Sequence, residues 1–248
     1  MRTPSETELL DLWEEGQVRH PIDRALLLFA WTRPDIAADR FARLPLGVVN
    51  AGLLKLRAAV FGPKVELQVE CEHCGDLLEI PLDISELAAA ANEQESGAEI
   101  EVDGFRFRLP DSRDLAAVAY DLDPEAVALR LLEACCVSRP EGDVGLADVL
   151  PQADARLEAA DPLADPRLDV VCPSCGQHMD AVLDPGVLLW DDVQASTRGV
   201  LGQVHALARA YGWQATTVER TEDFEAAFQA AVDARRPSLL HLKLDADV

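Results

Sequence analysis

Basic and aromatic residues are scarce in this chain of 248 residues. Lysine and arginine number 22 against 45 aspartates and glutamates, which gives a formal net charge of −23, and aromatic residues make up 5%. A surface of such negative charge repels phosphate backbones and anionic lipid headgroups. The composition therefore argues against a nucleic-acid-binding protein and against a protein that lies on a membrane.

Long apolar runs are also missing. No stretch reaches the roughly 18 uninterrupted apolar residues of a membrane span, and the start Met-Arg-Thr-Pro-Ser-Glu lacks the apolar centre of a signal peptide. Apolar residues still make up 49% of the chain, which is enough for a substantial core. We expect a folded, cytoplasmic protein without a membrane span, whose thiols are reduced.

The sequence patterns of common catalytic sites are absent as well. There is no phosphate-binding Gly-rich loop, no nucleophile elbow and no pair of histidines at helical spacing that would hold a catalytic zinc ion. Paired carboxylates are frequent, but in so acidic a chain they carry little information about acid–base catalysis. The sequence predicts a protein that is not an enzyme and has no small-molecule substrate.

Four of the six cysteines form two widely separated pairs, Cys71-Glu-His-Cys74-Gly75 and Cys172-Pro-Ser-Cys175-Gly176. In a Cys-x-x-Cys turn one backbone loop aims two sulfurs at one ion, and the following Gly relieves crowding. Four sulfurs fill the tetrahedral shell of zinc and leave no open position for water, which is typical of a structural site. We predict a structural zinc ion bound by Cys71, Cys74, Cys172 and Cys175.

Similar segments flank the two pairs. Each pair lies between two short segments with strand-like patterns, 65–70 and 77–81 around the first and 168–171 and 179–183 around the second. Two hairpins that face each other would form one four-cysteine unit. A redox dithiol or a disulfide is the alternative; a thioredoxin-like motif needs a helix next to the cysteines, whereas Gly75-Asp76 favours a hairpin.

Other possible ligands lie near the pairs. His73 lies inside the first pair and His178 just beyond the second, so either could replace a cysteine, but we expect both outside the ligand shell. The remaining cysteines, Cys135 and Cys136, lie in an apolar helical run and are expected to be core thiols.

Together these patterns predict an α+β protein in four parts. Residues 1–62 form a helical module, with a first helix capped by Thr3 and others from Pro21, over 35–44 and over 48–61. Residues 63–184 form the zinc-hairpin unit, which carries an inserted α/β region at 83–166. Residues 185–213 form a long helix, and residues 214–248 form an atypical tail.

The inserted region contains a hairpin signature, Asp103-Gly104, with alternating residues on both sides over 99–110. Its second arm sends alternate side chains to opposite faces, Phe105, Phe107 and Leu109 to one and Arg106 and Arg108 to the other. We expect the arginines on a solvated face, with an acidic partner as the alternative. Helices are predicted from Asp111, from Pro124 and over 146–160.

Several segments in combination resemble one protein family. They are Glu8-Leu-Leu-Asp-Leu-Trp-Glu-Glu-Gly16, Pro21-Ile-Asp-Arg-Ala-Leu26, the two Cys-x-x-Cys-Gly pairs, Phe107-Arg-Leu-Pro-Asp-Ser-Arg-Asp-Leu-Ala-Ala-Val118 and Val204-His-Ala-Leu-Ala-Arg-Ala-Tyr-Gly-Trp213. Over about residues 5–213 the chain resembles the T4-type baseplate proteins, which are baseplate or baseplate-hub assembly chaperone proteins of contractile phage tails and related injection systems. The resemblance implies a non-enzymatic part or helper of a baseplate, other baseplate or hub proteins as partners, and cysteine pairs as structural metal ligands.

The tail departs from that family. Residues 214–248, with an expected helix at 224–234 and an expected strand at 238–244, resemble the C-terminal end of thiamine-diphosphate enzymes of the acetolactate synthase type. The Gly-Asp-Gly and downstream Asn signature of those enzymes is absent, so the tail alone implies no thiamine chemistry. We expect a junction after the Ala-Leu-Ala-Arg-Ala-Tyr-Gly string that both families carry, a strand without neighbours, and poor packing of the tail.

These observations predict a baseplate protein or baseplate-hub assembly chaperone, found in the cytoplasm of the producing cell or retained in the assembled particle. Two alternatives stay open. One is a fragment of a zinc-dependent or thiamine-diphosphate-dependent enzyme. The other is a transcription-associated zinc-ribbon adaptor, which the net charge of −23 disfavours.

Overall fold

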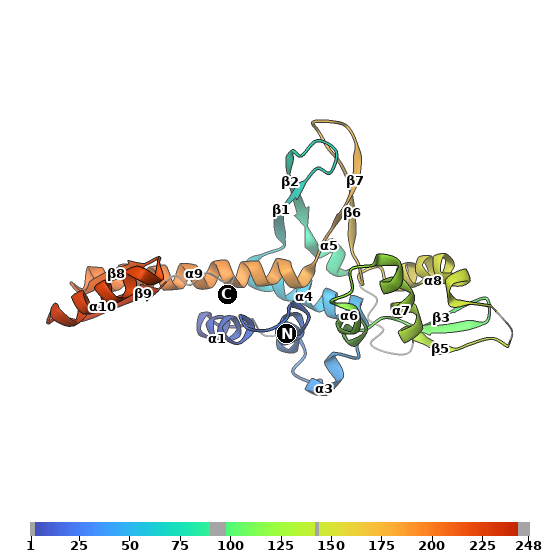
Figure 1. The fold of residues 1–248 in the computed structure, drawn as a ribbon, viewed down its shortest axis with the longest axis horizontal. Coiled ribbons are helices and arrows are strands. Elements are labelled where there is room, and N and C mark those ends of the chain that lie inside the picture. Colours follow the sequence, from blue (N-terminus) through green and yellow to red (C-terminus); the bar gives the residue numbers. More distant parts are fainter. Residues whose placement is uncertain (1–2, 90–97, 142–143, 243–248) are drawn as a thin grey trace. The chain divides into compact units, whose positions relative to one another are not determined.

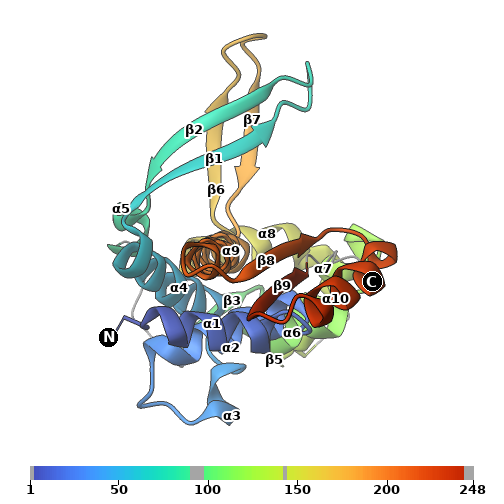
Figure 2. The ribbon, with the colours of Figure 1, turned by 90° about the vertical axis from the view of Figure 1, so that its left-hand side faces the viewer.

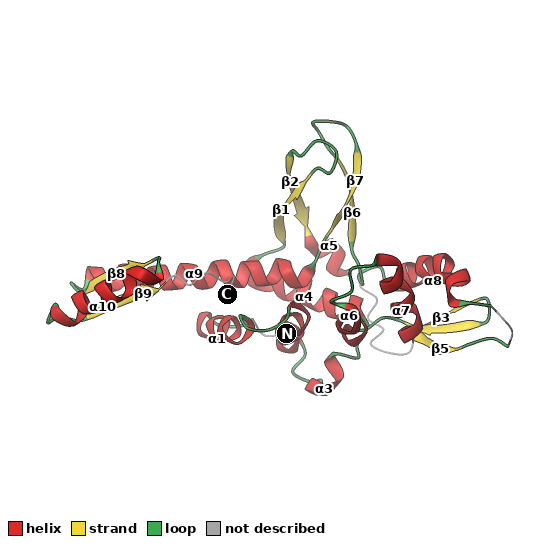
Figure 3. Cartoon of the chain, viewed as in Figure 1, coloured by secondary structure: helices red, strands yellow, loops and turns green. Residues whose placement is uncertain are grey.

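The computed structural model describes residues 3–89, 98–141 and 144–242. The chain combines helices with short strands that mostly form hairpins (Figures 1 and 3), so the predicted α+β class is confirmed. The chain divides into two compact units, Met1–Asp192 and Val193–Val248, and the boundary lies within the long helix α9 (Pro185–Ala210). The units are described separately below.

The first unit begins with the helices α1 (Glu6–Gly16), α2 (Pro21–Thr32), α3 (Ala38–Phe41) and α4 (Leu46–Phe61). The predicted cap of α1, Thr3, is wrong: Ser5 Oγ accepts the N–H of Glu8, and the Glu8 carboxylate accepts the N–H of Ser5. This reciprocal capping box satisfies two otherwise unpaired donors. Helix α3 has four residues, so only part of the predicted segment 35–44 is helical.

Helix α4 is the most buried helix of this module, with Leu53 and Leu54 fully inaccessible. Its N-cap residue, Pro45, offers no side-chain hydrogen bond. The carboxylate of Asp161 instead accepts the N–H of Gly47 at 3.0 Å and replaces the missing cap. Burial raises the pKa of Asp161, although the Gly47 hydrogen bond opposes that shift. The start of α4 is thereby fixed to the segment that precedes the second hairpin.

The other end of α4 is held by Arg57, which is 6% exposed. Its guanidinium donates to the Asp192 carboxylate at 2.8 Å, to the Lys64 carbonyl at 2.7 Å and to the Gly62 carbonyl. One side chain thus connects α4, the start of the first hairpin and α9. Since hydrogen bonds of a charged donor are stronger than neutral ones, Arg57 fixes the direction in which the chain leaves α4.

Two hairpins follow the predicted boundaries closely. The first consists of β1 (Lys64–Glu70) and β2 (Leu77–Asp83), the second of β6 (Arg167–Val171) and β7 (His178–Val182), and each is antiparallel. They lie side by side with adjacent tips (Figures 1 and 2). At their base, α4 and α5 (Ile84–Ala89) enclose an apolar cluster of Leu54, Val65, Ile84, Ala88 and Leu183.

The inserted region contains β3 (Glu99–Val102), β4 (Phe105–Arg108), α6 (Ser112–Val118), α7 (Pro124–Cys135), β5 (Cys136–Ser138) and α8 (Leu146–Ala160). The predicted β3–β4 hairpin is confirmed, and β5 adds a third strand beside β4. Strand β5 contradicts the expectation that Cys136 is helical: α7 ends at Cys135, and Cys136 pairs with Phe107 of β4. The segment 92–97, for which the polar sequence predicts a loop, lies outside the described residues.

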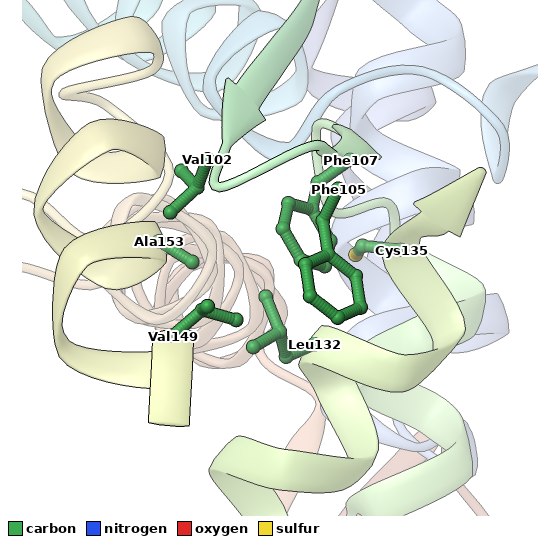
Figure 4. Close-up of a cluster of buried hydrophobic side chains, with 7 residues drawn as sticks. All are labelled: Val102, Phe105, Phe107, Leu132, Cys135, Val149 and Ala153. Atoms are coloured by element: carbon green, nitrogen blue, oxygen red, sulfur yellow. The ribbon is translucent and has the colours of Figure 1, made fainter. Parts of the chain in front are cut away.

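The core of this region is formed by Phe105 and Phe107, whose rings stack with centroids 5.8 Å apart. Figure 4 shows both rings together with residues of β3, α7 and α8, namely Val102, Leu132, Cys135, Val149 and Ala153. The opposite face of β4 differs in part from the expected solvated face. Arg106 is exposed and pairs with Glu99, whereas the half-buried Arg108 binds both carboxylate oxygens of Asp114 at 2.6 and 2.7 Å.

The second unit contains the remainder of α9, β8 (Gln214–Val218), a 3-10 turn at Thr221–Asp223, α10 (Phe224–Asp233) and β9 (Ser238–Leu242). The predicted helix is confirmed, but the expectation of a strand without neighbours is wrong, because β9 pairs in parallel with β8. The prediction missed β8, because this short segment shows no alternation of apolar and polar side chains. Helix α10 has no buried residue and exposes Phe224, Phe228 and Val232.

Replacement of Gly47 by Ala tests the Asp161 cap. A Cβ at position 47 would lie 1.7 Å from Asp161 Oδ1, so the buried carboxylate must shift and lose its hydrogen bond. We expect Gly47→Ala to lower the free energy of unfolding by about 1–3 kcal/mol, as measured by urea denaturation. Gly199→Ala, where a Cβ meets nothing within 4 Å, is the control and should leave stability unchanged or raise it. Equal effects of the two substitutions would contradict the role of Asp161.

The packing of the tail can be tested by amide hydrogen exchange. Because α10 buries no residue, we expect the amides of β8 and β9 to exchange faster than those of the two cysteine hairpins, since sparse apolar packing lowers the cost of local opening. Equally slow exchange in β8, β9 and the cysteine hairpins would show that the tail is as firmly packed as the first unit.

Candidate metal centre

Each Cys-x-x-Cys segment forms a tight turn at a hairpin tip. In the first, the N–H of Gly75 donates to the Cys71 carbonyl at 2.8 Å, and the N–H of Cys71 donates to the Asp76 carbonyl at 2.9 Å. Gly75 has a φ of 75°, in the left-handed region that glycine enters without steric cost. The residue type after the second cysteine is therefore fixed by the backbone of the turn.

The second turn repeats this geometry. The N–H of Gly176 donates to the Cys172 carbonyl at 2.8 Å, the N–H of Cys172 donates to the Gln177 carbonyl at 2.9 Å, and Gly176 has a φ of 72°. Two segments with different residues between their cysteines thus adopt the same backbone hydrogen bonds. Their likeness means that both present their sulfurs in the same way.

The four sulfurs converge between the hairpin tips. The Sγ atoms of Cys71 and Cys175 lie 3.7 Å apart, as do those of Cys74 and Cys172, and all four ligand atoms lie within 4.8 Å of one another. In a tetrahedral site with Zn–S bonds of about 2.3 Å the sulfurs are about 3.8 Å apart, whereas a disulfide bond measures about 2.05 Å. The predicted convergence is confirmed, and the spacing suits a shared metal ion.

Burial divides the four cysteines into two kinds. Cys71 and Cys172 are buried with Leu78 and Met179 in an apolar cluster between the hairpins, whereas Cys74 and Cys175 are exposed. The partly buried side chains Val69, Ile80 and Val170 extend this cluster along the strands. The sulfurs of Cys71 and Cys172, the inner sulfurs, therefore lie in contact with apolar side chains. Those of Cys74 and Cys175, the outer sulfurs, are open to solvent.

The pKa values of the thiols show the cost of bringing four sulfurs together. Backbone N–H groups of Cys175 and Ser174 lower the pKa of Cys172 to about 7. For Cys74, the backbone N–H of Asp76 acts in the same direction, but desolvation and the neighbouring sulfurs raise the pKa to about 12. Neighbouring thiolates disfavour one another's charge, so full ionisation of the set requires a cation at its centre.

The other candidate ligands lie outside this cluster. His73 and His178 are both exposed, and His178 Nδ1 lies 3.0 Å from the Asp169 carboxylate. Among the described residues, the group that could hold a metal consists of the four cysteines alone. Cys135 is a core thiol, as predicted, and burial raises its pKa to about 12.

A groove in the first unit was not predicted. It has a volume of about 850 Å³ and is lined by residues that include Asp154, Leu157, Glu158 and Asp161. These residues recur at helical spacing along α8 and just beyond its end. From this spacing, an acidic and partly apolar helix face could have been predicted from the sequence.

Comparison of the chain with protein-family models, with curated proteins and with solved structures found no match. None of the helices in the described part of the chain combines the length and apolarity needed to cross a bilayer.

Replacement of one inner cysteine tests whether the four sulfurs act as one site. We expect Cys172→Ser to reduce metal content and to speed amide exchange in both hairpins, with a loss of unfolding free energy of at least about 3 kcal/mol. Cys136→Ser is the matched control, because Cys136 lies in β5 and outside the cluster. Mass spectrometry under native conditions and hydrogen exchange provide the measurements. Faster exchange in the β6–β7 hairpin alone would contradict a shared site.

Proposed function

We propose that the four cysteines bind a structural zinc ion. Four thiolates in tetrahedral spacing favour zinc or iron over the hard cations magnesium and calcium, and zinc is the usual ion in a closed Cys₄ site of two Cys-x-x-Cys turns. Binding would contribute on the order of 10 kcal/mol to folding, if zinc-finger peptides are a guide. The ion would join two hairpins whose cysteines are separated by about 100 residues.

The proposed function is that of a non-enzymatic protein that works through contacts with other proteins. The observation that carries it is the set of four sulfurs, which leaves no position for water or substrate on the ion. Exposed apolar side chains offer surfaces for such contacts: Val204 and Leu207 of α9, and Phe224, Phe228 and Val232 of α10. The rings of Phe224 and Phe228 stack with centroids 5.8 Å apart, and exposed apolar side chains that lie together favour contact with other proteins.

We further propose that the partners are baseplate or hub proteins, and that the chain is a baseplate protein or a baseplate-hub assembly chaperone of a contractile tail or related injection system. The support is the resemblance over about residues 5–213, in which the two cysteine pairs take part. The exposed apolar side chains of α9 and α10 agree with a role in assembly.

Capture of partners by the purified protein tests this function. We expect the chain to retain baseplate wedge or hub proteins from a co-expression lysate, and we expect a zinc chelator or Cys172→Ser to abolish the capture while Cys136→Ser leaves it intact. The expected cause is loss of the zinc-joined hairpins. Capture of defined baseplate proteins is read by immunoblot. If none is retained by the zinc-loaded protein, the baseplate role is wrong, whatever the metal content.

The enzyme alternative differs in its metal chemistry. A catalytic zinc ion keeps an open position, whereas four sulfurs close the shell. We expect a cobalt-substituted protein to show the absorption of a tetrahedral thiolate site and to show no change on addition of azide or thiocyanate. A change in the visible spectrum with either anion would reveal an exchangeable position and favour an enzyme.

A further inference from the structure

The groove of about 850 Å³ in the first unit is lined by both apolar and charged side chains. Its apolar lining, called the floor below, includes half-buried or exposed side chains of α2, α6, α7, α8 and α9, namely Ile22, Leu115, Leu131, Leu150, Leu157 and Val187. Side chains of this kind are normally covered in a folded protein, because each buried methylene contributes about 0.8 kcal/mol. A ligand with an apolar face would gain free energy by covering them.

The charge of the groove has one dominant sign. Among the described residues that line it, the basic side chains are Arg24 and Arg167, and the acidic ones are Asp154, Glu158, Asp161, Asp165, Asp180, Asp184 and Asp191. Arg167 is paired with Asp165 at 2.7 Å, and Arg24 lies over the Trp190 ring at 4.3 Å. The cations of the groove are therefore engaged already, and acidic groups remain in excess.

The exposed acids of α8 show this excess most directly. Asp154 and Glu158 are four residues apart on the same helix face, a like-charge arrangement that destabilises a helix by a few tenths of a kcal/mol. Leu150 and Leu157 lie on the same stretch of the helix and line the same groove. The groove face of α8 thus alternates apolar and acidic contacts, which complements a helix that carries leucine-like and lysine-like side chains on one side.

We propose that this groove binds a cationic amphipathic segment of a partner protein, whose apolar face covers the floor and whose lysines or arginines meet Asp154, Glu158 and Asp180. The inference rests on the proposed function in one respect, that the chain works through contacts with other proteins. It adds the chemistry of the contact, and it does not depend on zinc or on a baseplate.

The probe is a fluorescent helix-forming peptide of leucine and lysine with the leucines on one face, titrated into the zinc-loaded full-length protein and followed by anisotropy. We expect binding that weakens with salt and that is weakened about fivefold by the double variant Asp154→Asn/Glu158→Gln. Val187→Ser, which shortens an exposed floor side chain, should weaken binding as well. The control for the charges is Glu66→Gln/Glu79→Gln on the β1–β2 hairpin, which removes two exposed acids away from the groove lining, and the control for the floor is Val137→Ser in β5.

The outcomes are distinct. The inference is overturned by equal weakening in the two double variants or by equal binding of a peptide of the same composition with scrambled order, because both indicate attraction to net charge alone. It is also overturned if spermine binds the groove and the peptide does not, which would indicate a small polyamine ligand. Absence of peptide binding together with chelator-sensitive capture of partners would reject this inference and leave the proposed function standing.

Discussion

Four sulfurs that lie within 4.8 Å of one another constrain everything around them. Bringing them together has a cost: desolvation and the neighbouring sulfurs raise the pKa of Cys74 to about 12, while backbone N–H groups lower that of Cys172 to about 7. A cation at the centre removes this conflict, and it can do so only while both hairpins hold their sulfurs in place. A bound metal, the two turns and the hairpin packing would therefore depend on one another.

The contacts at the base of the hairpins also hold the segments that carry the cysteines in place. Asp161 precedes the second hairpin and caps α4 through Gly47, while Arg57 at the other end of α4 binds carbonyls at the start of the first hairpin. Both ends of a deeply buried helix are thus attached to the segments that carry the cysteines. In this arrangement α4 sets the separation of the hairpin bases, and the sulfurs set the separation of the tips.

Local patterns in the sequence predicted the parts of the fold that local backbone chemistry determines. The turns at Gly75 and Gly176 require a positive φ, and so does the turn at Asp103-Gly104, where φ is 48° and 82°. These positions identified three hairpins before any tertiary contact was known. The convergence of two distant cysteine pairs followed from the coordination number of zinc.

Features that depend on contacts between residues far apart in the sequence could not be predicted from such local patterns. Nothing near Pro45 indicates that its helix is capped from Asp161, and β8 and β5 are strands because β9 and β4 pair with them. The described residues that line the groove include members of six helices, α2, α4, α6, α7, α8 and α9, so no single segment indicates it. The cap at Ser5 was missed for a simpler reason, since Thr3 with Glu6 and Ser5 with Glu8 offer the same spacing of a capping box.

The most direct test of the central claim is X-ray absorption at the zinc edge of the purified protein. The account predicts one zinc ion per chain with four sulfur neighbours at about 2.3 Å and no nitrogen or oxygen neighbour. A first shell that contains nitrogen or oxygen, or a fully folded protein without bound metal, would contradict it.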